Sequence, residues 1–202
     1  MYFDLRKYII AASLTVLIWT MALTSFGSIP IFGVDVTLLC IPIILGTCAL
    51  GLPYGLFLSF MFALTSLFMA LMGHPIALLA PLLNFPLEMY LTIFIPRLLI
   101  PFFTWLVFKA TSKWKAVFSY GLSAVVGSFA NTFLFLGFAY ALGAEALTET
   151  YQMSRSDLLK ALGGIVLSNG ILEAIVALLV CIPILLLLNK TLAIRGETPR
   201  QL

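Results

Sequence analysis

The chain contains very little charge. Asp, Glu, Lys and Arg make up 9% of its 202 residues, 62% are hydrophobic, and the mean hydropathy is +1.15. Soluble domains usually carry about 25% charged residues, so this composition excludes the ordinary soluble class. The net charge of +3 is too small to indicate nucleic-acid binding. The composition instead predicts a protein of the lipid bilayer.

Histidine and cysteine are also scarce. His74 is the single histidine, and Cys40, Cys48 and Cys181 lie inside apolar runs without metal-ligand spacing. We therefore expect no metal site and no structural disulfide. The chain has no nucleophile elbow, no histidine-based metal motif and no phosphate-binding loop. These absences predict a protein that is not an enzyme, has no cofactor and lacks an ATPase site of its own.

Long uncharged stretches are abundant and predict six membrane-spanning helices. The expected helices cover residues 8–24, a short segment before Gly51-Leu52-Pro53, a third ending near 72, and then 87–108, 116–142 and 158–188. Pro42 lies inside the short second helix, which we expect to be irregular and to face protein. No cleavable signal is evident. The predicted fold is an all-α membrane protein, a compact six-transmembrane-helix bundle forming one domain over residues 1–202.

Positive charges indicate how the bundle is oriented. With six spans both termini share one side, and most Lys and Arg residues fall on that side: Arg6, Lys7, Lys109, Lys113, Lys115, Lys190, Arg195 and Arg200. Arg155 and Lys160 fall on the other. The positive-inside rule therefore predicts both termini in the cytoplasm of a prokaryotic cell, with the protein in the plasma membrane. The expected outer loops, 25–36, 73–86 and 143–157, are the longer ones and could act as lids.

Three polar residues lie at the same predicted depth. Arg97, Asn131 and Glu173 each fall near the middle of an apolar segment bounded by charged residues. The bounding pairs are Glu88 and Lys109, Lys115 and Glu145, and Lys160 and Lys190. An ionised side chain at the bilayer centre costs about 2.5–3.5 kcal/mol, so these side chains should face partners and not lipid. Their shared depth predicts a polar pocket inside the bundle.

Other candidates accompany these three. Asn169 lies four residues before Glu173 on one helix face, and Tyr90 lies seven residues before Arg97. Pro96 should leave a backbone carbonyl free beside Arg97. His74, in an expected outer loop, is either a turn residue or a ligand contact.

Two interpretations of the polar set are compatible. In the structural one, Arg97 and Glu173 form a buried ion pair and the asparagines tie helices together. In the functional one, Arg97 is a fork for a substrate carboxylate, and Asn131, Asn169 and Glu173 bind hydroxyl and amide groups. An ion pair in the empty protein could open for a ligand, so the residue pattern leaves both possible.

Small residues on the first helix form a possible contact face. Ala11 and Ala12, with Thr15 one turn further on, would allow close approach of another helix, from a partner or from this chain.

Across nearly its whole length the chain resembles the substrate-binding S-components of energy-coupling factor (ECF) vitamin transporters, most closely the pantothenate-type members. The resemblance rests on short segments in a shared order and spacing: 29–34 leading into 37–46, Gly51-Leu52-Pro53-Tyr54-Gly55, Ile95-Pro96-Arg97-Leu98-Leu99, Gly127-Ser128-Phe129-Ala130-Asn131-Thr132 and Ser168-Asn169-Gly170-Ile171-Leu172-Glu173. The family usually has an Ala-x-x-x-Ala pair for docking on helix 1. Here Ala11 is followed by Thr15.

The resemblance implies a subunit that captures a vitamin and delivers it inward together with a transmembrane coupling (T) subunit and two cytoplasmic ATPases. Pantothenate would match the polar set with one carboxylate, two hydroxyls and an amide, and folate is the alternative ligand. Outside this family, a six-helix membrane scaffold of cell-wall morphogenesis remains possible, although it would need no polar pocket. A lipid phosphotransferase is disfavoured because the chain has no carboxylate cluster for metal-bound phosphate.

Overall fold

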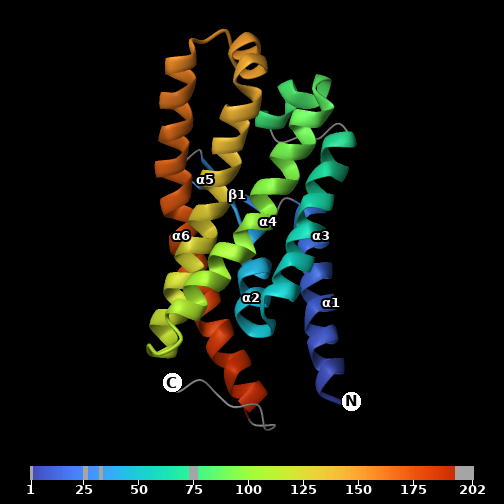
Figure 1. The fold of residues 1–202 in the computed structure, drawn as a ribbon, viewed down its shortest axis with the longest axis vertical. Coiled ribbons are helices and arrows are strands. Elements are labelled where there is room, and N and C mark those ends of the chain that lie inside the picture. Colours follow the sequence, from blue (N-terminus) through green and yellow to red (C-terminus); the bar gives the residue numbers. More distant parts are fainter. Residues whose placement is uncertain (1, 25–26, 32–33, 73–76, 194–202) are drawn as a thin grey trace.

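A computed structural model describes residues 2–24, 27–31, 34–72 and 77–193 (Figure 1). The described part contains six α-helices, a two-stranded hairpin and one 3-10 helix. Their bounds are α1 Tyr2–Leu23, β1 Ser28–Ile31, β2 Val34–Thr37, α2 Cys40–Leu50, α3 Leu52–Leu71, η2 Ala77–Asn84, α4 Pro86–Ala110, α5 Ala116–Tyr151 and α6 Arg155–Ala193. The predicted all-α fold with six helices is confirmed.

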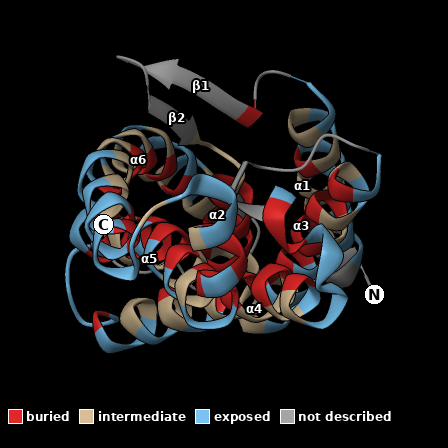
Figure 2. Cartoon of the chain, turned by 90° about the horizontal axis from the view of Figure 1, so that it is seen from above, coloured by how far each residue is buried: buried red, intermediate tan, exposed pale blue. Residues whose placement is uncertain are grey.

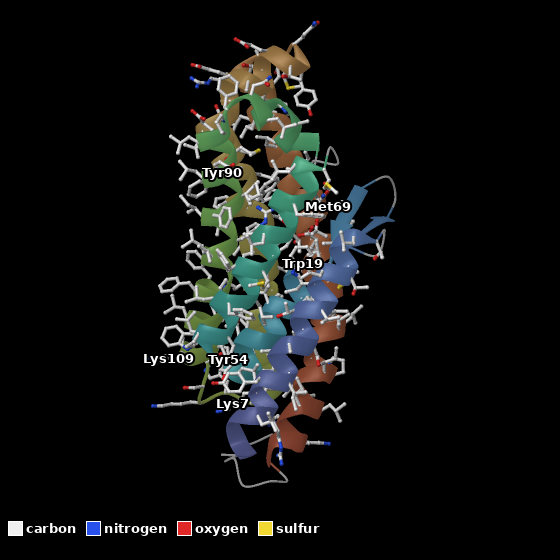
Figure 3. The ribbon with its side chains drawn as sticks, turned by 90° about the vertical axis from the view of Figure 1, so that its right-hand side faces the viewer. Lys7, Trp19, Tyr54, Met69, Tyr90 and Lys109 are labelled. Atoms are coloured by element: carbon white, nitrogen blue, oxygen red, sulfur yellow. The ribbon has the colours of Figure 1, made fainter. Side chains whose placement is uncertain are left out.

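Five of these helices are long and apolar enough to cross a membrane, and α2 is the short exception. The first helix begins and the last helix ends at the same end of the bundle (Figure 1). Lys7 of α1, Tyr54 of α3 and Lys109 of α4 also lie at this end (Figure 3). The six helices correspond to the six predicted segments. The short helix α2 crosses only part of the bundle.

The short helix α2 lies at the centre of the bundle, surrounded by the others (Figure 2). Every residue from Cys40 to Cys48 is buried, which confirms that this helix faces protein. The expectation that Pro42 interrupts it is wrong. Pro42 lies in the first turn, where a backbone N–H would have no carbonyl partner within the helix. Its lack of an N–H therefore costs no helical hydrogen bond, and the helix runs unbroken to Leu50. Gly51 then ends it at φ 99°, a conformation that glycine adopts readily.

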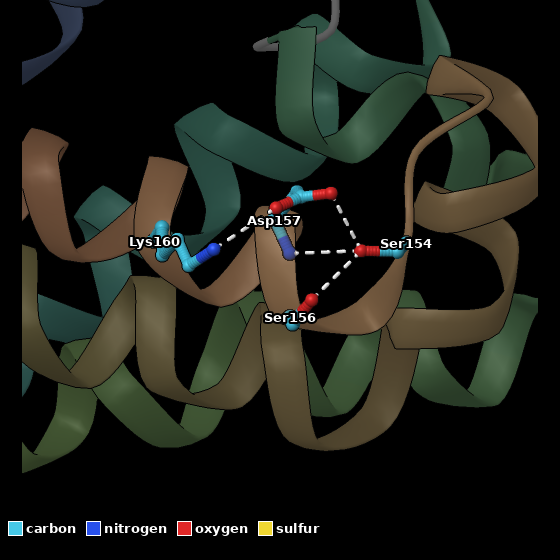
Figure 4. A network of polar contacts seen from close by, with 4 residues as sticks. All are labelled: Ser154, Ser156, Asp157 and Lys160. Atoms are coloured by element: carbon cyan, nitrogen blue, oxygen red, sulfur yellow. Dashed lines mark hydrogen bonds and ion pairs between the residues drawn. The ribbon is translucent and has the colours of Figure 1, made fainter.

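Helices α5 and α6 are both longer than predicted. The expected loop at 143–157 shrinks to residues 152–154, because α5 continues to Tyr151 and α6 already begins at Arg155. Ser154 starts α6 by accepting the Asp157 N–H at 3.2 Å and donating its hydroxyl to the Asp157 carboxylate at 2.7 Å (Figure 4). Lys160 pairs with the same carboxylate at 3.2 Å. This capping arrangement fixes where α6 begins.

The segment between α1 and α2 contains a β-hairpin that the sequence did not predict. Its antiparallel register pairs Ser28 with Thr37 and Ile31 with Val34. The Leu38 N–H donates to the Gly27 carbonyl at 3.0 Å and closes the base of the hairpin. Strand β2 packs against α6. The hairpin therefore leads directly into the central helix α2, and its second strand packs against α6.

Candidate functional site

Arg97 is buried in the middle of α4, with 3% of its surface exposed. Its guanidinium lies between two aromatic rings, 4.7 Å from the centre of Phe62 on α3 and 5.1 Å from that of Phe135 on α5. One nitrogen, Nη1, donates to the Ile93 carbonyl at 2.9 Å, whereas Nε has no hydrogen-bond partner. The aromatic rings stabilise the cation, but they leave part of its donor capacity unused.

The backbone of Arg97 is held by a neighbouring helix. Pro101 lies four residues further along α4 and has no N–H to donate to the Arg97 carbonyl. The hydroxyl of Ser59, fully buried on α3, donates to that carbonyl instead. From the sequence, Pro96 was expected to leave a carbonyl free beside Arg97. The hydrogen bond that the structure shows is explained by Pro101.

Glu173 lies on α6 and is also 3% exposed. Its Oε1 accepts the backbone N–H of Thr37 at 2.9 Å, and its Oε2 accepts the hydroxyl of Thr132 on α5. The Asn131 side chain also lies within hydrogen-bonding reach of this carboxyl group. Donors from the hairpin and from α5 therefore satisfy both oxygens of a carboxylate that lipid could not solvate.

No ion pair joins Arg97 to Glu173 or to another carboxylate in the described part of the chain. The ion pair required by the structural interpretation is therefore absent, although Asn131 does help to tie α5 to α6. Both polar groups contact α5: Thr132 contacts Glu173, and Phe135, about one turn later, covers Arg97. The bundle therefore contains a buried cation without a counter-charge and, separately, a carboxylate that protein donors satisfy.

The other predicted site residues differ in how deeply they are buried. Asn131 is buried at 9% exposure, and Asn169 is half-buried on α6, with its Oδ1 3.3 Å from the Ser168 hydroxyl. Tyr90 is 42% exposed and lies at the outer edge of the bundle, so it does not share the buried face of Arg97 (Figure 3). The seven-residue spacing assumed a regular helix, but Pro96 lies between the two residues. His74 lies outside the described residues.

The small residues of α1 face different ways. Ala11 is buried in the protein at 5% exposure, and Thr15 is half-buried with its hydroxyl bonded to the Ala11 carbonyl at 2.8 Å. Ala12 is exposed. Of the three predicted docking residues, Ala12 is therefore the one that another helix could reach directly.

Several residues that build the site were not predicted. Thr132 and Ser59 complete the surroundings of Glu173 and Arg97. Thr92 on α4 is fully buried, and its hydroxyl has no partner. Thr132 stands next to Asn131 in a segment already identified, so adjacency could have indicated it. Thr37 contributes its backbone N–H as well as its side chain, and a backbone donor carries no signal in the sequence.

The arrangement suits the binding of an anion. An uncompensated guanidinium in a low-dielectric interior attracts a carboxylate strongly, and buried donors without partners gain from a ligand that supplies acceptors. The described residues contain no group of histidine, cysteine and carboxylate side chains placed to hold a metal ion.

Comparison with known proteins identifies the family. A search of curated proteins found no match. The family described as "ECF transporter, substrate-specific component" matches residues 6–185, which is most of the chain and includes all the site residues discussed above. With six helices around a buried polar site and this match, the chain belongs to the family of substrate-specific S-components of ECF transporters.

Proposed function

We propose that this S-component binds pantothenate, with the ligand carboxylate on Arg97 and the hydroxyl and amide groups near Asn131 and Asn169. The observation that carries the proposal is the Arg97 guanidinium, buried at 3% exposure with an unpartnered Nε and no carboxylate partner in the described residues. A desolvated cation of this kind is costly unless an anion binds it. A small polyhydroxy acid matches one guanidinium with nearby amide donors.

Family membership indicates that this binding step takes place within a transporter complex in the membrane. The S-components are multi-pass membrane proteins and non-catalytic transporter subunits, and the family implies assembly with a T subunit and ATPases. The scaffold and phosphotransferase alternatives of the sequence analysis do not fit this family. In the proposed orientation the end that holds both termini faces the cytoplasm, where the ATPases bind, and the ligand enters from the opposite side.

The binding proposal is tested with the purified, detergent-solubilised protein. Pantothenate at micromolar concentration should raise the melting temperature, because a ligand that binds the folded state stabilises it. Folate, riboflavin and biotin should leave the melting temperature unchanged, since flat ring systems would leave the buried polar groups unpaired. A shift with folate alone would make folate the ligand, and no shift with any of the four would refute this assignment.

Arg97 provides the second test. Arg97→Ala should weaken pantothenate binding by about 2–5 kcal/mol, because the ligand carboxylate loses a desolvated charge partner. Arg97→Lys should restore part of the affinity, since an ammonium supplies the charge without the planar fork. Isothermal titration of the three proteins measures this series. Near-normal affinity in folded Arg97→Ala protein would refute the proposed carboxylate contact.

A further inference from the structure

Glu173 connects three parts of the fold through one carboxylate. Its two oxygens accept from the Thr37 backbone N–H, at 2.9 Å, and from the Thr132 hydroxyl, while Glu173 itself belongs to α6. Thr37 is 136 positions away in sequence. Because both oxygens are engaged by protein donors, the carboxylate is better placed to hold these segments together than to bind a ligand.

The segment that Glu173 holds is the junction between the hairpin and α2. Thr37 is the last residue of β2, and α2 begins three residues later at Cys40, which is 1% exposed. No side chain caps α2, and its first turn contains no acidic residue. The Glu173 carboxylate, which also lies near Cys40, supplies negative charge at this helix start from another element.

This junction lies beside Asn131, a residue of the proposed ligand site. The Asn131 side chain is within hydrogen-bonding reach of the Glu173 carboxyl group, which also accepts from Thr37 and Thr132. A ligand held by Arg97 and Asn131 would therefore lie against the junction. When the Thr37–Glu173 hydrogen bond is intact, the hairpin and the start of α2 stay fixed against α5 and α6 at this level.

We propose that Glu173 is a positioning residue that holds the hairpin–α2 junction closed beside the ligand site and so slows ligand release. The ligand part rests on the proposed function, whereas the closure of the junction is a property of the empty protein. Breaking the Thr37–Glu173 hydrogen bond lets the junction open locally, without unfolding the helices around it.

The native cysteines provide a direct readout of this opening. Cys40 lies at the junction, and Cys48, which is 8% exposed, lies about two turns further along α2. Cys181 of α6 is fully buried near Cys40, in the core cluster that contains all three cysteines. The intact protein in nanodiscs is treated with a charged methanethiosulfonate reagent, and the labelling rate of each cysteine is followed by peptide mass spectrometry. Local opening exposes Cys40 and leaves Cys48 buried, while general loosening of the bundle exposes all three.

Three variants separate the contribution of the Glu173 hydrogen bonds from that of its charge. Glu173→Ala removes every hydrogen bond of the carboxylate and should accelerate Cys40 labelling about tenfold, because the rate follows the open population. Glu173→Gln keeps an acceptor for the Thr37 N–H but loses the charge, so a smaller rise of a few-fold is expected. Thr132→Val leaves the Thr37 bond in place and serves as the matched control, with a rate near that of the wild type.

The labelling rates distinguish local opening of the junction from general loosening of the bundle. Faster labelling of Cys40 with unchanged labelling of Cys48 supports the proposal, and the Gln variant decides the question if the Ala variant does not fold. Equal acceleration of all three cysteines, or no change at Cys40, overturns it. In stopped-flow measurements Glu173→Ala should also raise the pantothenate dissociation rate about tenfold. If the wild type does not bind pantothenate, the ligand assignment fails, and the labelling of the empty protein still decides whether Glu173 holds the junction.

Discussion

At the scale of single residues, the Ser59 hydroxyl replaces a backbone donor that Pro101 cannot supply. Ser59→Ala should leave the buried Arg97 carbonyl without a partner and lower the free energy of unfolding by about 1–3 kcal/mol. Ser66→Ala is the matched control, because the Ser66 hydroxyl bonds the Phe62 carbonyl of its own helix at 3.2 Å. Thermal unfolding should show a smaller loss there. Pro101→Ala restores an N–H, so it should reduce the effect of Ser59→Ala; equal losses in both backgrounds would contradict this account.

The buried polar residues were predictable from depth alone, because charge inside a bilayer must face protein. Arg97, Asn131 and Glu173 are indeed all buried. Most of their partners were not predictable. Serine and threonine occur throughout the apolar helices, so Ser59 carries no distinguishing signal, and a backbone donor carries none at all. Thr132 is indicated only by its place next to Asn131. The ion pair of the structural interpretation is absent for a related reason: each charged group has partners on the elements packed directly against it.

At the scale of helices, close packing around α2 depends on glycine. A Cβ added at Gly127 of α5 would collide with the Thr104 hydroxyl and lie 2.9 Å from Ile44 of α2. Gly127→Ala should therefore destabilise the protein by about 1–3 kcal/mol through overpacking. Gly137→Ala, on the same helix, meets no neighbouring atom within 4 Å and should be neutral or stabilising by up to about 1 kcal/mol. Comparable losses in thermal unfolding of the two variants would contradict this explanation.

Helix existence was predicted better than helix length. The apolar runs located all six helices, but α5 has 36 residues, about 54 Å at about 1.5 Å per residue, against a hydrocarbon core of about 30 Å. Hydropathy reports only the part that crosses lipid. Glu145 bounded the predicted span, although a helix continues readily into water. The hairpin was missed because its two strands have four residues each, too short for a periodic pattern.

At the scale of the whole molecule, α1 is the span with the least contact to the rest of the bundle, since 11% of its apolar window is buried against 50% for α5. A span with so much uncovered surface is the natural place for another membrane subunit to pack. The small side chains on α1 would permit close approach of a partner helix. The burial of Ala11 and the exposure of Ala12 show which of them can be used to test this.

We expect Ala12→Trp to leave pantothenate affinity and melting temperature of the isolated subunit near wild-type values, because the new ring points away from the bundle. The same variant should abolish ATP-driven uptake by the assembled transporter, since the indole holds a partner helix away. Ala11→Trp is the contrasting variant: at 5% exposure it overpacks the protein's own core and should lower the melting temperature of the isolated subunit. Binding assays on the subunit and uptake by proteoliposomes of the complex separate the two effects. Normal uptake by Ala12→Trp protein would show that the partner packs against another face.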